Sequence, residues 1–260
     1  MKNLLVTGGA GFIGTNFVYY WLDKHPEDNI IVLDALTYAG NKENLIQAQT
    51  NPKFKFVHGN ILDQPLVESL ITEHKVNTIV HFAAESHVDR SIDGPSDFVA
   101  TNVVGTFNLL EAARAHHASL SKEAADRFRV VHVSTDEVYG SIEEGSWDEQ
   151  RPLEPNSPYS ASKAGSDLLA RSYYRTHGMN VSITRCSNNY GRYHFPEKLI
   201  PLMILNALAG KALPVYGDGK QVRDWLYVED HARALIKVAT EGEIAETYNI
   251  GGHNEKQNIE

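Results

Sequence analysis

The sequence predicts an α/β fold in which a doubly wound parallel sheet carries a smaller C-terminal lobe. Short runs of β-branched residues alternate with longer amphipathic stretches through the first half of the chain. These runs are apolar almost throughout, which is typical of strands that are covered on both faces of a parallel sheet. After Arg185 the sequence changes to turns rich in Asn, Gly and Asp. These three observations indicate one large sheet followed by a less regular region.

The strands are spaced so that a helix fits between each pair. We expect strands at residues 3–7, 30–34, 54–58, 78–83 and 128–135, with helices between them. Right-handed crossovers place such helices on both faces of the sheet. Turn sequences at residues 188–191 and 217–219 then interrupt the pattern. We expect that region to form the smaller lobe, beside the strand ends.

Composition and charge exclude several classes of protein. With 42% hydrophobic residues over 260 positions, the chain can bury a large core, unlike a disordered or fibrous protein. A formal net charge of −9 argues against nucleic-acid and membrane-surface partners, which need a basic face. The single cysteine, Cys186, rules out an intramolecular disulfide, and we find no leader or long apolar segment. We therefore expect a cytoplasmic protein.

A glycine-rich segment follows the first strand and opens the first helix. It reads Gly8-Gly9-Ala10-Gly11-Phe12-Ile13-Gly14. Glycines allow a tight turn and let backbone amides approach a pyrophosphate at the positive end of the helix. A glycine turn without a ligand is the alternative. The position between strand and helix favours a dinucleotide site of the Rossmann type, with contacts from Gly8, Gly11, Phe12, Ile13 and Gly14.

Asp34 ends the second strand, 20 residues after Gly14. A carboxylate at this place hydrogen-bonds the adenosine ribose hydroxyls and repels a 2′-phosphate. The following residues, Ala35, Leu36 and Thr37, include no arginine that could accept such a phosphate. We therefore predict NAD as the cofactor rather than NADP, with contacts from residues 34–37.

Small and polar residues follow the third and fourth strands, where ligands bind in open α/β sheets. The expected contacts there are Asn60, Ile61, Ala83, Ala84, Glu85 and Ser86, with Thr101 in the following helix. Residues of these types are also ordinary turn formers. His81 and His87 could bind a metal, but no cysteine or matching histidine spacing accompanies them, so we predict no metal site.

Tyr159 and Lys163 form a Tyr-X-X-X-Lys pair in a helix that we expect to begin after Pro158. The spacing places both side chains on one face, one turn apart. A nearby ammonium and a nicotinamide cation lower the tyrosine pKa from about 10. The tyrosine can then take an alcohol proton while hydride leaves for the cofactor. Thr135, at the end of the fifth strand, can hydrogen-bond the same oxygen. A surface helix turn is the alternative.

Two acidic residues, Asp136 and Glu137, directly follow Thr135. Oxidising an alcohol to a ketone acidifies the neighbouring C–H bond. One carboxylate can then remove that proton while a protonated carboxyl protonates a departing hydroxyl, which requires opposite protonation states. In the structural alternative, Asp136 caps a turn and Glu137 is solvated. The acid pair beside the Tyr/Lys pair indicates alcohol oxidation followed by a second reaction.

These segments resemble the dTDP-glucose 4,6-dehydratases, which are extended short-chain dehydrogenase/reductases. The resemblance covers residues 8–14, 34–41, 81–91, 134–140, 159–163, 187–191, 196–201 and 217–225. It implies a lyase that uses NAD to oxidise C4 of dTDP-glucose, eliminates water across C5 and C6, and returns hydride to C6 to give dTDP-4-keto-6-deoxyglucose. It implies that Tyr159 is the C4 base and Glu137 the C5 base. Asp136 would protonate the leaving 6-hydroxyl, and Thr135 would orient the sugar.

The resemblance also implies how the substrate is bound. Arg223 can fork onto a phosphate, and Lys198 supplies a point charge. The expected substrate contacts are Glu85, Ser86, Thr135, Asn188, Lys198, Leu199, Pro214, Val215, Tyr216, Arg223 and Asn258, with Asn189 nearer the nicotinamide. Three residues depart from the family pattern: Asn60, Arg192 and His194 stand where Asp, Pro and Gln are usual.

The resemblance finally suggests a domain organisation. We expect residues 1–185 to form the NAD-binding domain with 220–245 packed onto it, and 186–219 and 246–260 to form part of the substrate-binding lobe. Members of the family continue further, and residues 254–260 read as the start of a helix, so we expect a truncated lobe. We also expect a homodimer in which helices at about 96–116 and 158–175 pair with their partners.

Two other functions share parts of this pattern. A sugar-nucleotide 4-epimerase or a related isomerase uses the Tyr/Lys chemistry without needing the acid pair. A truncated, inactive NAD-binding scaffold would keep the glycine segment alone.

Overall fold

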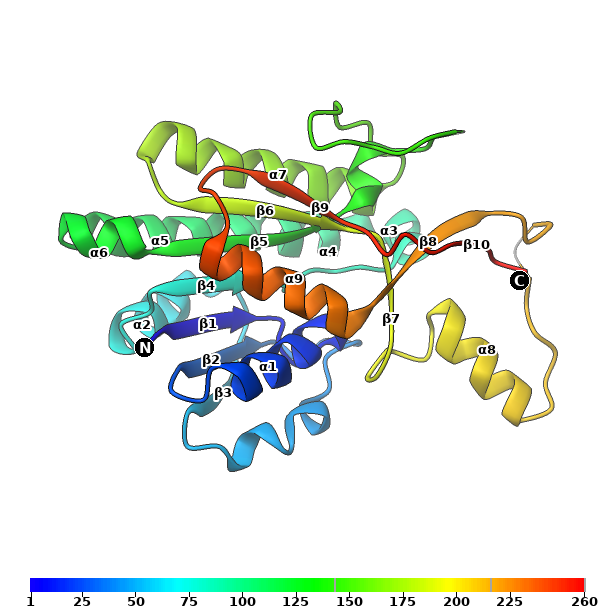
Figure 1. Ribbon diagram of the computed structural model, residues 1–260, viewed down its shortest axis with the longest axis horizontal. Helices are drawn as coiled ribbons and strands as arrows, with labels where there is room; N and C mark the ends of the chain where they lie inside the picture. The colour runs from blue at the N-terminus through cyan, green and yellow to red at the C-terminus, as the bar shows by residue number, and fades with distance from the viewer. Residues whose placement is uncertain (143, 216, 260) are drawn as a thin grey trace.

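The computed structural model describes residues 1–142, 144–215 and 217–259. Its centre is a sheet of seven parallel strands in the order β3-β2-β1-β4-β5-β6-β9 (Figure 1). The strands are β1 (Asn3–Thr7), β2 (Asn29–Asp34), β3 (Phe54–His58), β4 (Thr78–His81), β5 (Arg129–Thr135), β6 (Val181–Cys186) and β9 (Thr247–Ile250). The order 3-2-1-4-5-6 is that of a doubly wound dinucleotide-binding sheet, so the predicted fold class is confirmed.

All five predicted strands are present, and their boundaries differ from the predicted ones by no more than two residues. The largest difference is at β4, which ends at His81 rather than at residue 83. Ladder bonding stops there because the Ala83 N–H turns to the side-chain hydroxyl of Thr7, at 3.4 Å. The chain therefore leaves the sheet two residues early.

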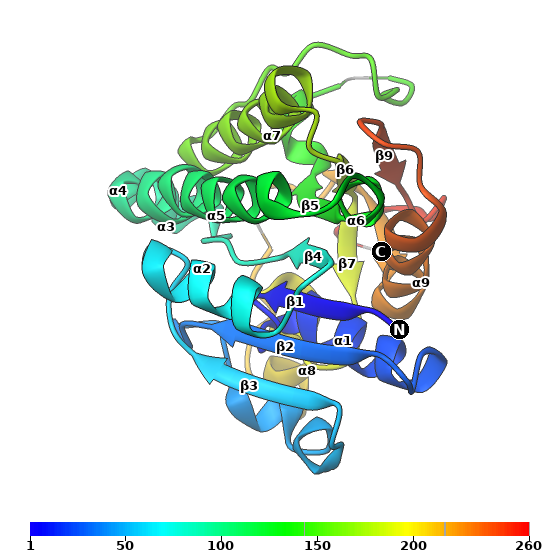
Figure 2. The same ribbon diagram turned by 90° about the vertical axis from the view of Figure 1, so that its left-hand side faces the viewer.

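Helices cover both faces of the main sheet. Helices α1 (Phe12–Lys24) and α9 (Val228–Glu241) lie on one face, and α2 (Gln64–Glu73), α5 (Thr106–Ser119) and α7 (Pro158–His177) lie on the other (Figure 2). Side chains alternate along each strand, so in β1 Leu5 joins the core beneath α2 and α5, whereas Leu4 and Val6 join the core beneath α1 and α9. An apolar core results on each side of the sheet.

The remaining helical segments are short. They are η1 (Lys42–Leu45), η2 (Ala48–Thr50), α3 (Val88–Asp93), α4 (Pro95–Phe98), η3 (Val99–Gly105), α6 (Lys122–Arg127), η4 (Asp136–Tyr139) and α8 (Leu199–Leu208). Segment η3 is π-helical and joins α4 to α5, so one helical run extends from residue 95 to residue 119. Within the described residues, no helix combines the length and apolar character needed to cross a bilayer.

A second, three-stranded sheet lies beyond the carboxyl ends of the main strands, near α8 (Figure 1). It consists of β7 (Asn188–Tyr190), β8 (Val222–Tyr227) and β10 (Glu255–Gln257). Strand β10 runs antiparallel to β8, so the predicted helix at residues 254–260 is wrong. The free edge of β8 offers backbone partners, and this tertiary pairing overrides a polar local sequence with little intrinsic preference.

The segments of the two predicted domains interleave along the chain. Strand β9 hydrogen-bonds to β6 as the last strand of the main sheet, although residues 246–260 were predicted to lie in the lobe. Helix α9 packs against α1, as predicted for residues 220–245, whereas β8 in the same range belongs to the small sheet. The division into an NAD-binding domain and a substrate-binding lobe stays a prediction.

Candidate active site

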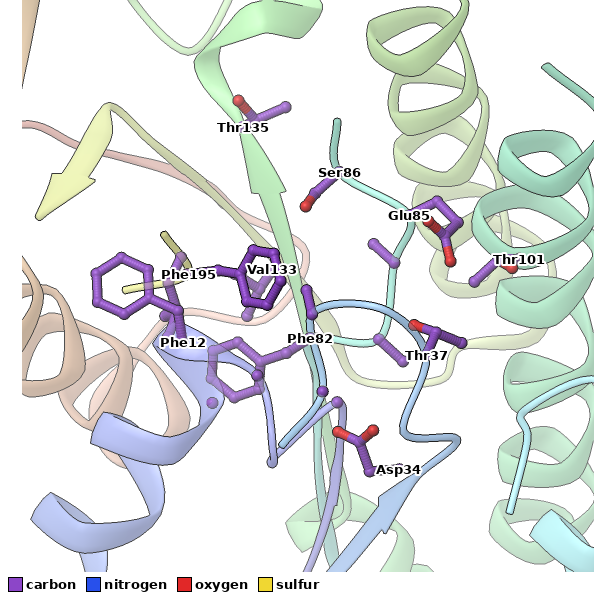
Figure 3. A pocket seen from close by; sticks show the side chains of 18 of the residues that line it. Phe12, Asp34, Thr37, Phe82, Glu85, Ser86, Thr101, Val133, Thr135 and Phe195 are labelled. Atoms are coloured by element: carbon purple, nitrogen blue, oxygen red, sulfur yellow. The ribbon is translucent and has the colours of Figure 1, made fainter. Parts of the chain in front are cut away.

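A cleft of about 320 Å³ runs along the carboxyl ends of the main-sheet strands. One end is lined by Asp34 and Asn60, after β2 and β3, and the other by Tyr159 and Asn189. In Figure 3, Asp34 and Thr37 lie toward one end and Thr135 toward the other, with Glu85, Ser86 and Thr101 along one side and Phe12 and Phe195 along the opposite side. Ligands of open α/β sheets bind at this edge.

The glycine segment forms part of the cleft wall between β1 and α1. Gly8 has a φ of +73°, and a Cβ there would lie 2.6 Å from the backbone nitrogen of Ala83. A Cβ at Gly14 would collide with the carbonyl oxygen of Gly8. Gly11 caps α1 without a side-chain hydrogen bond, so no cap occupies the amides of the first turn. The segment can therefore accept an anionic group against its backbone.

Asp34 is buried at the end of β2 and is tied to the glycine segment. Its Oδ2 accepts from the Ala10 N–H at 2.9 Å, and its Oδ1 accepts from the Leu36 N–H at 2.8 Å. Burial raises the pKa of Asp34, and these two amides oppose the rise. Each oxygen keeps a further lone pair for a ribose hydroxyl. Leu36, a predicted cofactor contact, does not line the cleft, because its side chain packs against the core beneath α1.

Asn102, in the π-helical segment η3, holds the chain after β4. Its side-chain amide accepts from the Glu85 N–H at 2.8 Å and donates to the Glu85 carbonyl at 3.0 Å. It also donates to the Ser162 hydroxyl of α7 at 2.8 Å. This buried contact fixes the backbone of Glu85 against α7, so that Glu85, Ser86 and the neighbouring Thr101 line the cleft.

The two histidines near this segment have partners within the protein. His81 is buried between the hydroxyls of Thr7, at 2.7 Å, and Thr106, at 2.9 Å. His87 accepts from the Arg90 N–H at 3.4 Å and caps α3. Both rings therefore hold the structure around the cleft.

Helix α7 begins at Pro158, one residue before the predicted start, because its first turn is capped. Ser157 accepts from the Ser160 N–H at 3.1 Å, and the Ser160 hydroxyl accepts from the Ser157 N–H at 2.9 Å. This reciprocal cap, with Pro158 at the first helical position, fixes where the helix starts. It thereby places Tyr159 and Lys163 in the first two turns, where both are buried.

Tyr159 and Lys163 line the inner end of the cleft, and Lys163 Nζ donates to the Val133 carbonyl at 2.9 Å. Burial, and after it the Glu137 carboxylate, raise the pKa of Tyr159 well above its usual value, and the Thr135 hydroxyl opposes this. The lowered pKa that we predicted includes the nicotinamide cation and stays a prediction, because in the protein alone desolvation of the phenolate dominates. Tyr159 is therefore a phenol until a further positive charge lies beside it.

The acid pair opens η4 directly after β5. Thr135 donates from Oγ1 to Asp136 Oδ1 at 3.3 Å and accepts from the Glu137 N–H at 3.2 Å. Burial, and after it the charge of Glu137, raise the pKa of Asp136 to about 7. Burial also raises the pKa of Glu137, but Arg223 and Lys198 oppose the rise. Thr135 and Glu137 line the cleft, whereas Asp136 does not line it and lies beside the Thr135 hydroxyl.

Two contacts join the C-terminal region to the inner end of the cleft. His231 Nδ1 lies 2.9 Å from Asn189 Oδ1, and Asn189 donates to the Ser187 carbonyl at 2.9 Å, which fixes its amide. Burial lowers the pKa of His231 to about 3, so its ring is neutral. Lys198 Nζ donates to the Ser86 carbonyl at 3.2 Å, which connects the loop before α8 to the chain after β4.

A second cavity, of about 180 Å³, adjoins the cleft. It is lined by Asn188, Glu197, Leu199, Leu202, Met203, Arg223, Trp225 and Asn258, of which Asn188 and Glu197 also line the cleft. The predicted substrate contacts Asn188, Leu199, Arg223 and Asn258 therefore come together. Pro214 and Val215 are exposed and line neither space, and Tyr216 lies outside the described residues.

Several residues of the cleft were not predicted. His194 stacks on Phe12 with ring centroids 4.2 Å apart, and Phe195 meets Tyr38 edge-on at 5.9 Å. These contacts depend on the loop after β7 folding back over α1, which no local pattern reveals. Cys186 also lines the cleft, at the end of β6, and the rule that ligands bind at strand ends could have found it.

The residues of the cleft fit a bound NAD. The glycine wall leaves room for a pyrophosphate at the start of α1, and Asp34 has free lone pairs for a ribose but would repel a 2′-phosphate. Tyr159, Lys163 and Asn189 line the far end of the same cleft, where the nicotinamide would lie. Of the predicted cofactor contacts, Leu36 alone is outside the described lining.

Comparison with known proteins reveals close relatives. A family model described as GDP-mannose 4,6 dehydratase matches residues 5–260. The dTDP-glucose 4,6-dehydratase of Neisseria meningitidis serogroup B is 55% identical over 262 residues, which cover 100% of this chain and 74% of that protein. Relatedness therefore extends across the glycine segment, the acid pair and the lobe.

Solved structures agree with the sequence comparison. The dTDP-glucose 4,6-dehydratase of Streptomyces venezuelae, crystallised with NAD bound, is 55% identical with a TM-score of 0.92, and the match covers 99% of this chain and 78% of that one. A UDP-glucose 4-epimerase of Thermotoga maritima, crystallised with UDP-glucose, has a TM-score of 0.88 but is only 28% identical, over 99% of this chain and 79% of that one. The fold is common to both enzymes, whereas the sequence is much closer to the dehydratase.

Proposed function

The chain belongs to the dTDP-glucose 4,6-dehydratase family, and from this premise we propose how its cleft performs that reaction. The enzyme is an NAD-dependent sugar-nucleotide dehydratase that converts dTDP-glucose to dTDP-4-keto-6-deoxyglucose by C4 oxidation, elimination of water across C5 and C6, and hydride return to C6. One observation carries the proposed mechanism. The Thr135-Asp136-Glu137 segment lies at the carboxyl end of β5 beside Tyr159, at the inner, nicotinamide end of a cleft that fits a dinucleotide.

Tyr159 is the group that takes the proton of the C4 hydroxyl. When bound, NAD supplies a hydride acceptor and a positively charged nicotinamide ring. Burial keeps Tyr159 protonated in the protein alone, so the phenol becomes a base when that charge and the Lys163 ammonium offset desolvation. Thr135 lies within hydrogen-bonding reach of the Tyr159 hydroxyl and holds the same alcohol oxygen. Tyr159 is thus a weak base until NAD is bound.

The acid pair performs the elimination. Once C4 is a ketone, the C5 proton is acidic, and Glu137 removes it because Arg223 and Lys198 favour its charged form. Asp136, with its pKa raised to about 7, holds a proton that it gives to the leaving 6-hydroxyl. The two carboxyls lie next to each other in the chain, but their different surroundings give them opposite tasks. Asp136 does not line the cleft itself, but it accepts a hydrogen bond from the Thr135 hydroxyl, which does. Its proton therefore reaches the sugar beside that hydroxyl.

The nucleotide end of the substrate occupies the second cavity. Arg223 supplies a guanidinium for the diphosphate, with Asn188, Leu199 and Asn258 around it. Lys198, whose ammonium is held at the Ser86 carbonyl, lines the cleft next to Glu197, which lines both spaces. A diphosphate bridging the cavities would therefore place the glucosyl ring beside the acid pair.

Conversion of dTDP-glucose tests this function. We expect the chain with NAD to form a keto sugar that absorbs in alkali, without net reduction of NAD because the reaction is redox-neutral. The matched control is Tyr159→Phe, which lacks the C4 base and should form no product. Formation of the C4 epimer without keto sugar would instead support an epimerase. NAD binding without any conversion would support a scaffold.

We also propose that the protein is a homodimer. Large apolar side chains are exposed along α3, the π-helical segment and α5, and on α7: Ile92, Val99, Val104, Phe107 and Leu168. Helix α7 contacts α3, the π-helical segment and α5, so these side chains lie on α7 and on the helices packed against it. Contiguous apolar surface of this kind is typical of an interface between subunits. Light scattering should give twice the chain mass, and Leu168→Glu should reduce it to one chain. A monomeric wild-type protein would contradict the proposal.

Two properties remain predictions. The absence of a basic face, expected from the net charge of −9, argues against nucleic-acid partners. The single cysteine agrees with a reducing compartment, and we propose the cytoplasm.

A further inference from the structure

Lys163 presents an electrostatic problem that the proposed mechanism does not solve. Its side chain is only 4% exposed, and its one described hydrogen bond is to the neutral carbonyl of Val133. Burial lowers the pKa of Lys163, because an ammonium in a medium of low dielectric loses its hydration. A charged Lys163 beside Tyr159 therefore requires a compensating negative charge inside the protein.

Asp167 is placed to supply this negative charge. It follows Lys163 by one helical turn, so both side chains lie on the same face of α7, and it is 1% exposed. Its Oδ2 accepts from Arg185 Nε at 2.9 Å, and its Oδ1 lies 3.2 Å from His132 Nε2. Residues of β5 and β6 thus hold the carboxylate, which does not line the cleft.

The contacts of Arg185 extend this buried cluster. Arg185 donates from Nη1 to the Tyr139 hydroxyl at 2.7 Å, and Tyr139 donates to Asn249 Oδ1 at 2.8 Å. The guanidinium is therefore fixed by groups from η4 and β9 as well as by Asp167. Asp167 keeps its negative charge, because His132 and Arg185 lower its pKa despite burial.

The other titratable groups that face Lys163 do not provide this charge. Those that interact with Lys163 are His81 on β4, His132 on β5 and Cys186 on β6. The nearby elements also carry Tyr159 on α7, Arg185 on β6, and Asp136, Glu137 and Tyr139 on η4, none of which shifts the pKa of Lys163. Burial and Lys163 itself hold the pKa values of His81 and His132 low, so both rings are neutral. Burial raises the pKa of Cys186 to about 12, which keeps it a thiol. The two carboxyls of the acid pair do not shift the pKa of Lys163, and they are needed for the elimination.

We propose that Asp167 is a positioning residue that keeps the buried Lys163 ammonium charged beside Tyr159. The proposal rests on the proposed dehydratase function and deepens it, because it names the group that maintains the cation of the Tyr/Lys pair. Without Asp167, two buried cations would share the cluster. A guanidinium in a protein cannot lose its proton, whereas a buried ammonium can. Lys163 is therefore the group that becomes neutral.

Titration of Lys163 tests the proposal without any turnover. The full chain is made with lysine carrying ¹³C at Cε, and the Lys163 signal is assigned as the one lost in Lys163→Met. In Asp167→Asn we expect the pKa of Lys163 to fall by about 1 to 3 pH units, which is the usual effect of losing an adjacent opposite charge. Asp167→Glu keeps the charge and should restore the wild-type titration. An unchanged titration in Asp167→Asn would overturn the proposal.

A second variant separates charge from structural damage. Arg185→Gln breaks the same ion pair but removes a cation, so the pKa of Lys163 should stay the same or rise. If Asp167→Asn and Arg185→Gln both lower it, the effect is structural and the proposal fails. If Asp167→Asn does not fold, the double variant Asp167→Asn with Arg185→Gln removes both charges of the ion pair. The pKa of Lys163 should still fall in it, by less than in Asp167→Asn. An unchanged pKa of Lys163 in the double variant would also overturn the proposal.

Turnover provides an independent measurement. In the NAD-loaded chain the alkaline limb of the pH profile should move to lower pH in Asp167→Asn, because the charged form of Lys163 is lost sooner, and Asp167→Glu should reverse this. A wild-type chain that makes no keto sugar would contradict the function, while the titration would still decide the role of Asp167. A wild-type chain that turns over, with an alkaline limb unmoved in Asp167→Asn, would contradict the role of Asp167 alone.

Discussion

Raising the pH should slow the elimination of water before it affects the oxidation at C4. Asp136 acts as a proton donor, and burial together with Glu137 raises its pKa from 3.8 to about 7. At neutral pH a carboxyl with the ordinary value holds a proton on the order of one time in a thousand, whereas Asp136 holds one about half the time. The protonated form is lost as the pH rises through about 7, so the elimination rate should fall there.

Asp136→Asn tests the assignment directly. The amide has the same shape but cannot give up a proton, so we expect the elimination to slow by about 10²- to 10⁴-fold, or about 3 to 5 kcal/mol of barrier. Oxidation at C4 depends on Tyr159 and should continue. Rapid-mixing absorbance of the reduced nicotinamide follows the oxidation, and mass spectrometry of quenched samples follows loss of water. An Asp136→Asn enzyme that eliminates water at the wild-type rate, with the wild-type pH dependence, would refute the reasoning.

The same carboxyl should also affect stability. Its pKa is about 7 in the folded protein and near 3.8 when unfolded, so the unfolded chain releases the proton first as the pH rises. Stability is therefore lost between these two values and stays lower above about pH 7. Asp136→Asn should raise the Tm above pH 7 and leave it unchanged below the unfolded value, as measured by calorimetry across the pH range. An equal change in Tm at both extremes would contradict this linkage.

Three further substitutions test the elements that build the site. Ser157→Ala removes the α7 cap and should cost about 1 kcal/mol, lowering Tm by about 2 to 4 °C, whereas Ser172→Ala on the exposed side of the same helix should change Tm less; equal losses would contradict the cap. Gly14→Ala should weaken NAD binding at least about tenfold by calorimetric titration, while Gly165→Ala, where a Cβ makes only ordinary contacts, should not. Asp34→Ser should reduce the preference for NAD over NADP, and an unchanged ratio of affinities would remove its assigned role.

The main sheet could be predicted because its signals are local. Each predicted strand is a short apolar run, and β1, β3 and β4 are followed by α-helices as expected. The helix expected between β2 and β3 is wrong, because only the short 3-10 segments η1 and η2 lie there. The start of α7 could also be predicted to within one residue, since Pro158 favours the first turn of a helix, whereas the Ser157 cap was found only in the structure. The strand β10 could not be predicted, because the edge of β8 decides its conformation and its own sequence does not.

The candidate site was predictable only where a residue of a suitable chemical type directly follows or ends a predicted strand. Glycines, Asp34 and the acid pair satisfy that condition, and all but Asp136 line the cleft. The raised pKa of Tyr159 depends on how completely it is desolvated, which is a property of packing. Asp167 had no signal as a functional residue, because its importance arises from Arg185 and His132, which are brought to it by two other strands.

The position of β9 has a consequence for how the chain folds during synthesis. Strand β6 leaves the ribosome long before β9, and β7, α8, β8 and α9 are made between them. Until β9 arrives, β6 presents an unpaired backbone edge, which is a template for pairing with other chains. Closing the loop from β6 to β9 also carries an entropic cost that slows this last step. The edge of β6 is therefore where a nascent chain is most exposed to aggregation, and chaperones that shield strand edges should act on β6 in that interval.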